Sequence, residues 1–287
     1  MSIILFFARL LAKLPTRLLS SLGTLLGVML SRLASRRSCI VRTNLQLVFP
    51  SLSDEERGRI GKAHFAQLGR GLLEVLVIWF TTNQRSVLSL IRDARVTGLS
   101  YWQEKINQQG VILCVFHHTH MEAMGVLLGQ LGEVHPVYRP QNNAQLEAIS
   151  AQSRSRWTAG AVSNRQVKQM IRLLKQKKTL WLAPDQRNRG DGIPIMFMGH
   201  ECLTHPSIAR LARMTNSAII PVICHQAPDG CLELAFKPTI DQISTKSDSE
   251  VLRELMLLLE QEVTQYPEQY FRVHDRFNIG DQTCSST

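Results

Sequence analysis

Short apolar runs alternate with amphipathic stretches along most of this 287-residue chain. Uninterrupted apolar runs are typical of strands that a parallel sheet buries on both faces. We expect such strands at 111–116, 134–138, 179–182, 193–197, 218–223 and 232–236. Helices are expected at 121–131, 165–176, 206–214 and 250–265, and after the S-x-x-E capping sequence at 53–56. This alternation predicts an α/β fold with a mostly parallel central sheet flanked by helices.

The first 37 residues have a different pattern, in which apolar runs dominate. Residues 18–30 carry no charge, but at 1.5 Å per residue they reach only about 20 Å across a hydrocarbon core of roughly 30 Å. Arg9, Lys13 and Arg17 recur every fourth residue and would line one helical face. We predict a helical membrane anchor at 1–37, lying in the headgroup region, followed by a single domain at 38–287.

Two other interpretations of this segment are weaker. A cleaved signal peptide would need a small-residue cleavage site, and arginines interrupt the apolar run instead. A soluble helical hairpin would need more polar surface than these residues offer.

The net charge of +10, with an isoelectric point near 9.6, indicates an acidic partner. Between residues 1 and 53 there is no acidic residue, and the seven basic ones are Arg9, Lys13, Arg17, Arg32, Arg36, Arg37 and Arg42. The rest of the chain is only mildly basic, so we expect an ordinary surface there. A basic, apolar N-terminus favours an anionic membrane surface over nucleic acid, on the cytoplasmic side of the membrane.

The six cysteines show no C-x-x-C spacing, and several lie inside apolar runs. A thiol in such a run packs as a small hydrophobic side chain. The pattern predicts neither a disulfide framework nor a zinc knuckle, as is usual in a reducing cytoplasm.

A polar cluster from His117 to Glu122 follows the predicted strand at 111–116 without a break. Open α/β sheets bind their ligands at the carboxyl ends of strands, so this position marks a candidate site. In the H-x4-E spacing, Glu122 would accept a hydrogen bond from one ring nitrogen of His117 and leave the other free. An imidazole held in this way is a general base that can deprotonate an attacking hydroxyl.

The neighbouring histidines allow a metal interpretation. His118, His120 and Glu122 approach the H-x-H-x-D-H signature of zinc hydrolases. Glu122 replaces the aspartate and Ala123 the last histidine, so two defining positions fail. We expect no metal and no cofactor, and keep a zinc hydrolase, or histidines packed in a turn without chemistry, as alternatives.

Two further polar segments follow predicted strands. After 179–182 the chain breaks at Pro184 into a loop with Asp185, Gln186, Arg187 and Arg189, whose guanidinium and backbone N–H groups suit a phosphate. Arg139 follows the strand at 134–138 and could hold a phosphate or polarise a carbonyl. A solvated connector and a surface ion pair are the respective alternatives.

These segments, in this order, resemble the bacterial lipid A biosynthesis acyltransferases. The resemblance covers almost the whole chain and is carried by the basic apolar N-terminus, Asn44-Leu45 through Phe49-Pro50, the H-x4-E of His117 and Glu122, Tyr138-Arg139-Pro140, Ala183-Pro184-Asp185-Gln186, Pro194–Phe197 with Gly199, Thr204, Ala212 and Pro221, and Tyr270-Phe271-Arg272-Val273-His274-Asp275-Arg276-Phe277.

The resemblance implies a glycerolipid-acyltransferase-like fold and an enzyme of the inner membrane. It implies transfer of a fatty acyl chain from acyl carrier protein to a hydroxyl of a Kdo-bearing lipid A precursor. His117 would be the general base and Glu122 its orienting partner. Arg139 would bind near the acceptor or the oxyanion, and Asp185 would support the site from a second strand.

Two departures from the family pattern keep alternatives open. His118 and His120 are extra histidines, and either could compete with His117 as the base, with His118 the nearer rival. Asp275 stands where the family's C-terminal block has a basic residue. A lysophospholipid or another membrane lipid is the alternative acceptor, although the F-P-E-G-T-like block of glycerophosphate acyltransferases is absent.

Overall fold

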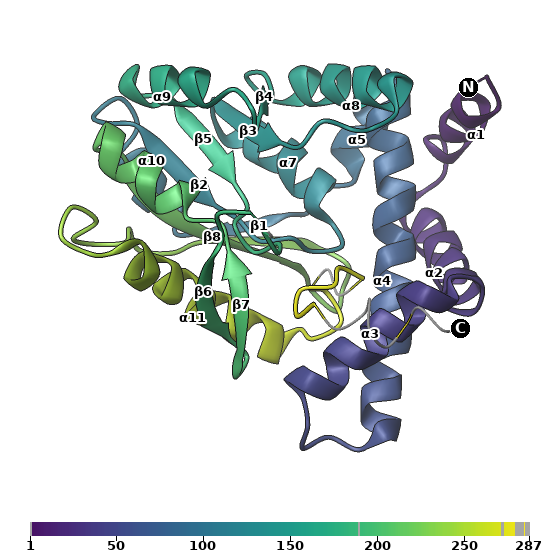
Figure 1. Cartoon of the computed structure of the whole chain (residues 1–287). Coiled ribbons are helices and arrows are strands. Elements are labelled where there is room, and N and C mark those ends of the chain that lie inside the picture. Colours follow the sequence, from purple (N-terminus) through teal and green to yellow (C-terminus); the bar gives the residue numbers. More distant parts are fainter. Residues whose placement is uncertain (1, 189, 271–272, 279–283, 285–287) are drawn as a thin grey trace.

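A seven-stranded sheet forms the centre of the molecule in the computed structural model, which describes residues 2–188, 190–270, 273–278 and 284 (Figure 1). The strand order is β1-β9-β8-β2-β5-β3-β4. The strands are β1 (Arg95–Thr97), β2 (Val111–Cys114), β3 (Val134–Tyr138), β4 (Val162–Ser163), β5 (Thr179–Leu182), β8 (Ala218–Gln226) and β9 (Leu232–Phe236). The five strands from β8 to β4 run parallel, whereas β9 and β1 run the other way. The predicted α/β fold with a mostly parallel sheet is confirmed.

Helices cover both faces of this sheet. They are α5 (Gln84–Ser89), α6 (Ser100–Gln103), α7 (Met121–Leu131), α8 (Ala144–Trp157), α9 (Val167–Lys175), α10 (Ser207–Thr215) and α11 (Asp248–Gln265). Every residue of β2 is buried, and alternate side chains enter two separate cores. Leu113 joins the core under α5 and α7, while Ile112 and Cys114 join the core under α9, α10 and α11.

One predicted strand lies outside the central sheet. Residues 193–197 form β6 (Ile193–Phe197), which pairs only with β7 (His200–Thr204) in a separate antiparallel hairpin. Only alternate residues of β6, Ile195 and Phe197, are buried. A strand with one exposed face does not fit between two neighbours of a sheet covered on both sides, which explains its position.

The N-terminal residues form α1 (Ser2–Leu11), α2 (Thr16–Leu33), α3 (Ser35–Val48) and α4 (Asp54–Phe80). The capping box predicted at 53–56 begins α4. Within the described residues, no single helix has the length and apolar character to cross a membrane. By length and composition alone, α2 and α3 together pass that test, with a 93° bend between them.

Glycines bring α4 unusually close to two other segments. A Cβ added at Gly27 of α2 would lie 1.9 Å from the Phe65 carbonyl oxygen, and one added at Gly69 would lie 2.1 Å from that of Gly23. Two residues further along α4, a Cβ on Gly71 would lie 1.9 Å from the carbonyl oxygen of Thr119. Only glycine permits such approaches, so α4 contacts both α2 and the 117–120 turn at backbone distance.

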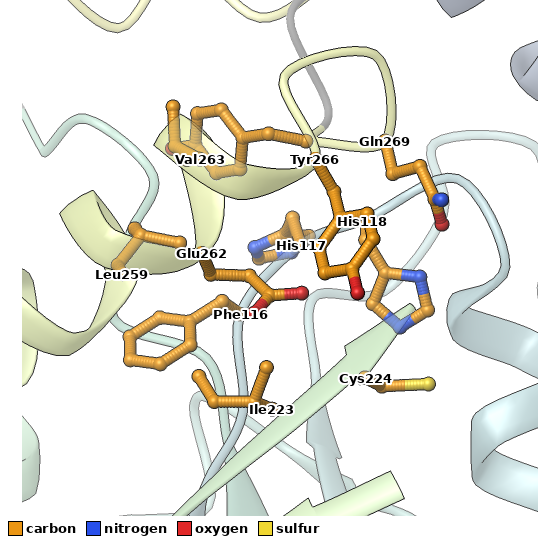
Figure 2. Close-up of a pocket in the computed structure, with 11 residues that line it drawn as sticks. Phe116, His117, His118, Ile223, Cys224, Leu259, Glu262, Val263, Tyr266 and Gln269 are labelled. Atoms are coloured by element: carbon orange, nitrogen blue, oxygen red, sulfur yellow. The ribbon is translucent and has the colours of Figure 1, made fainter. Parts of the chain in front are cut away.

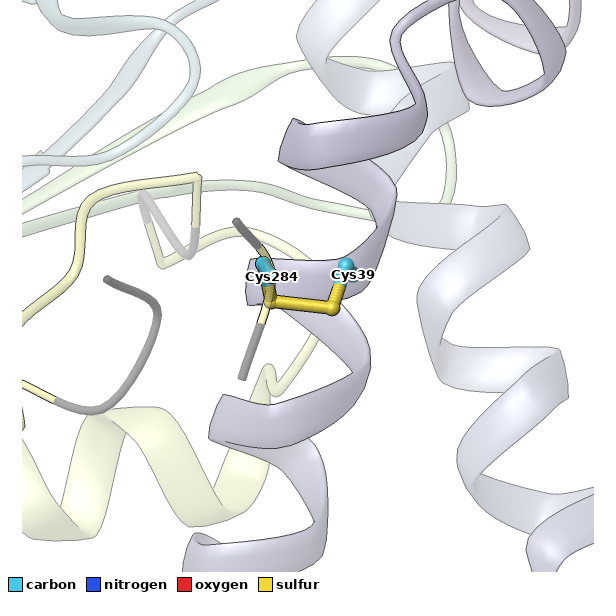
Figure 3. The surroundings of a disulfide bond; sticks show 2 residues. All are labelled: Cys39 and Cys284. Atoms are coloured by element: carbon cyan, nitrogen blue, oxygen red, sulfur yellow. A yellow bond between two sulfur atoms is a disulfide. The ribbon is translucent and has the colours of Figure 1, made fainter. Parts of the chain in front are cut away.

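A disulfide joins Cys39 of α3 to Cys284 near the C-terminus (Figure 3). The cysteine pattern indicated no disulfide framework, and this single disulfide was not expected from it. The two residues are 245 positions apart, and their meeting depends on the C-terminal segment lying against α3, which cysteine spacing does not reveal. The other four cysteines are free thiols, and Cys114, Cys202 and Cys224 are buried as predicted.

Candidate active site

A histidine–aspartate pair lies at the carboxyl ends of two neighbouring strands. In the parallel pair β2–β5, Cys114 is opposite Leu182, and His117 and Asp185 each follow three residues later. The backbone N–H of His117 donates to one carboxylate oxygen of Asp185 over 3.0 Å, and the ring Nδ1 meets the other oxygen at 2.8 Å. Asp185 therefore holds both the backbone and the ring of His117.

Asp185 is charged although its side chain is only 1% exposed. Burial alone would raise its pKa, but His117, through its charge and both hydrogen bonds, and the Arg276 guanidinium together hold the pKa of the Asp185 carboxyl below its usual value. An ionised carboxylate only accepts hydrogen bonds, so the proton of a neutral His117 ring sits on Nδ1. The lone pair is then on Nε2.

His117 lines a cavity of about 1170 Å³ above the ends of β2, β3 and β5. Four other residues predicted for the site, Glu122, Arg139, Gln186 and Arg187, line the same cavity, and Asp185 lies behind His117. Arg189 lies outside the described residues. The cavity exceeds the roughly 300–1,000 Å³ of sites for drug-sized ligands.

Glu122 does not hold the His117 ring, which corrects the pairing expected from the H-x4-E spacing. Its two carboxylate oxygens accept from Trp79 Nε1 at 3.0 Å and from Arg154 Nη2 at 2.7 Å. Glu122 lies in the first turn of α7 and faces α4 and α8, whereas Asp185 lies on the adjacent strand next to His117. Strand adjacency decides the partner, and the short sequence separation does not.

Arg154 is a cavity residue that the sequence did not indicate. Its guanidinium lies 5.4 Å from the ring centre of Trp79 and 5.1 Å from that of Tyr138. Nη1 is buried and has no hydrogen-bond partner among the described residues. Arg154 lies on α8, whose apolar positions are scattered and which was not predicted. The positive charge of Arg154 was therefore the single sequence signal that could have indicated it.

The two neighbouring histidines point elsewhere. His118 lines a small pocket with Cys224, Glu262 and Tyr266 (Figure 2) and does not line the large cavity, whereas His117 lines both. Burial, together with the nearby His120 and His117, lowers the pKa of His118 to about 3, so it stays neutral. His120 contacts Glu74 through Nδ1 and Gln67 through Nε2. Of these three histidines, only His117 faces the cavity.

The histidine turn does not assemble a zinc site. His118 and His120 have different partners, and the ring nitrogens of His120 are both engaged by side chains of α4. Across the described parts of the chain, no group of three or more His, Cys, Asp or Glu side chains is placed to hold a metal ion.

The comparison that decides the family extends over nearly the whole chain. A model of the bacterial lipid A biosynthesis acyltransferases matches residues 1–278. The chain belongs to this family. It is 27% identical over 286 residues to the lipid A biosynthesis lauroyltransferase of Escherichia coli K12, covering 96% of this chain and 90% of that protein. It is also 27% identical over 269 residues to the palmitoleoyltransferase of the same organism, covering 92% and 86%.

In this lipid A biosynthesis acyltransferase, the C-terminal block closes one side of the site. The N–H of Arg187 donates to His274 Nε2 over 3.1 Å, and burial lowers the pKa of His274 to about 4. Asp275, the departure from the family pattern, lies 3.6 Å from Arg187 and pairs with its charge. The acid thus balances an arginine of the 185–187 loop. Phe271 and Arg272 of this block lie outside the described residues.

Proposed function

We propose that this enzyme transfers a fatty acyl chain from acyl carrier protein to a hydroxyl of a Kdo-lipid A precursor. The observation that carries the proposal is His117, whose ring is held through Nδ1 by the buried Asp185 and which lines a cavity of about 1170 Å³. Family membership supports acyl transfer in lipid A synthesis, and the names of the relatives specify lauroyl and palmitoleoyl chains. Apolar side chains such as Met121 and Leu211 line the same cavity and suit an acyl chain.

The proposed reaction needs one base and no covalent enzyme intermediate. The acceptor hydroxyl gives its proton to His117 Nε2 while its oxygen attacks the carbonyl carbon of the thioester. The tetrahedral oxyanion collapses, the carbon–sulfur bond breaks, and the departing thiolate takes the proton from the imidazolium. The products are a new ester and the free carrier thiol. Asp185 stabilises the transient imidazolium, as the acid of a hydrolase triad does.

Arginines supply the positive charge that both substrates require. Arg154 lines the cavity, its buried Nη1 has no hydrogen-bond partner among the described residues, and it is the candidate donor to the developing oxyanion. Arg36, Arg37, Arg139 and Arg187 also line the cavity and suit the phosphates and carboxylates of the acceptor. Glu122 would act by holding the Arg154 guanidinium in place.

We further propose that the N-terminal helices hold the enzyme on the cytoplasmic face of the inner membrane. Large apolar side chains of α1 and α2 are exposed, among them Phe6 at 65%, Leu25 at 58% and Leu33 at 76%. Apolar surface of this kind beside basic residues is typical of helices that lie in a lipid interface.

The test is mass spectrometry of the product formed by the full-length enzyme from acyl-acyl carrier protein and a tetraacylated Kdo-lipid A precursor. We expect the acceptor to gain the mass of one acyl chain. The rate at which this product forms should be at least about a thousandfold lower in His117→Ala. His118→Ala is the matched control and should retain most of the activity. Donor hydrolysis without transfer would favour a hydrolase, and an intact donor with no product would favour another acceptor lipid.

A further inference from the structure

The cavity reaches the surface at α9 and α10, where exposed side chains line it. Val167 of α9 and Met214 of α10 line it and are 48% and 61% exposed, whereas Met170 and Leu211 line it and are buried. Each helix therefore places one apolar side chain at the surface and another inside. Between them, these four residues lead from solvent toward the strand ends that carry His117.

The surface beside this opening is basic. From residue 163 to residue 184 there is no acidic residue; Arg165, Lys168 and Arg172 lie at and before the first turns of α9, whereas Lys175, Lys177 and Lys178 lie at its far end, where Lys178 pairs with Glu133. The expectation of an ordinary surface beyond the N-terminus misses this segment, because acidic residues elsewhere offset its charge in the sum. On α10, Arg210 and Arg213 share the carboxylate of Asp248, so that helix adds a smaller net positive charge.

This opening and the N-terminal helices occupy opposite sides of the molecule. In Figure 1, α9 and α10 lie at the left and α1 and α2 at the right. On the side of the N-terminal helices, the cavity is lined by Arg36, Arg37 and Ile40 of α3. The two sides of the cavity could thus receive two different substrates, one from the N-terminal side and one from the α9–α10 side.

We infer that α9 and the Val167–Met214 opening are the docking surface for the acidic carrier protein that delivers the acyl thioester. The inference rests on the proposed function, because it assigns a place to the proposed donor. An acidic protein would pair with Lys168 and Arg172, which lie one turn apart and are exposed. Its thioester arm would enter between Val167 and Met214, and the acceptor would arrive on the side of α1 and α2.

The test compares two charge-reversal variants of the full-length enzyme with the same change in charge. Lys168→Glu with Arg172→Glu alters the proposed surface. Arg85→Glu with Arg92→Glu alters exposed residues at and beside α5, outside the cavity. Steady-state transfer from acyl carrier protein is measured at low and at high salt. We expect the first variant to raise the KM for the carrier protein on the order of tenfold at low salt with kcat little changed. The difference should shrink at high salt, and the control should match wild type.

The outcomes separate the docking surface from the proposed function. If wild type transfers the acyl chain and both variants have the same KM, the docking surface is wrong and the function stands. If wild type does not use acyl carrier protein at all, the proposed donor fails and the docking surface fails with it. If the α9 variant loses binding to vesicles of anionic phospholipid while its KM is unchanged, the basic face contacts the membrane, which also overturns the inference.

Discussion

Two carboxylates lie at the cavity, and they differ in burial and in the groups that they bind. Asp185 is 1% exposed and binds the backbone and ring of His117, whereas Glu122 is 20% exposed and binds Arg154 and Trp79. The first carboxylate fixes the tautomer of His117, the proposed base, and the second holds the Arg154 guanidinium. Glu122, five residues from the base in sequence, is thus not its partner, and the comparison teaches that two acids with the same charge can have separable roles.

The proposed difference between the two carboxylates is tested most directly by neutralising Asp185 without changing its shape. We expect Asp185→Asn to lower kcat by about 10³–10⁴-fold, because the amide no longer stabilises the imidazolium and favours the wrong tautomer. The KM values for both substrates should change far less. Initial rates with saturating substrates provide the measurement. If Asp185→Asn were nearly as active as wild type and Glu122→Gln were inactive, Glu122 and not Asp185 would be the functional partner of the His117 ring.

The matching change at Glu122 should cost less. Glu122→Gln removes the charge that holds Arg154, and we expect turnover to fall about 10- to 100-fold through misplacement of the guanidinium. The double variant with Arg154→Gln should lose little more than Arg154→Gln alone, because both changes act on the same group. Additive losses in this cycle would mean that Glu122 acts independently of Arg154.

The buried side of the site should also affect stability at acid pH. The pKa of His118 is lowered from 6.5 to about 3, so between these values the unfolded chain binds a proton that the folded chain excludes. The free energy of unfolding should therefore fall as pH drops through this window, by roughly 1.4 kcal/mol per pH unit for this group. His118→Gln should reduce the loss between about pH 7 and pH 5 by roughly 2 kcal/mol, measured by urea unfolding.

His274 contributes to the same fall and remains in the variant, so part of the pH dependence should persist. The carboxyl of Asp185 contributes at lower pH, because its pKa lies below its usual value of 3.8. An identical pH dependence in wild type and His118→Gln would show that His118 does not stay neutral in the folded enzyme.

The smallest expected effect tests the indole that supports Glu122. Trp79→Phe keeps an aromatic face beneath Arg154 but removes the N–H that donates to the carboxylate over 3.0 Å. Because the charged pair with Arg154 remains, we expect turnover to fall less than about tenfold. A loss as large as that of Glu122→Gln would show that the indole, and not the arginine, positions this acid.

Five strands of the central sheet were predictable from their apolar runs, whereas the short edge strands β1 and β4, which are not buried throughout, were not. The runs at 134–138, 179–182 and 232–236 match β3, β5 and β9, and the polar residues after β2 and β5 do meet at one cavity. The order of strands was not predictable, since hydropathy does not say that β5, and not β3, lies beside β2. That order is what brings Asp185 to His117. The helix α8 was missed because its apolar residues are sparse, and Arg154 was missed with it.

The glycines of α4 have a consequence for how the enzyme meets its lipid. Gly69 contacts α2 and Gly71 contacts the carbonyl of Thr119, so one helical turn links the N-terminal helix to the 117–120 turn. If α2 lies in the bilayer surface as proposed, the height of His117 above that surface is fixed by the backbone of α4. An acceptor hydroxyl at the same distance from the membrane surface as His117 would reach the proposed base, and a hydroxyl at a different distance would not. The choice among the hydroxyls of a multiply acylated lipid would then depend on their distance from the membrane surface as well as on the shape of the cavity.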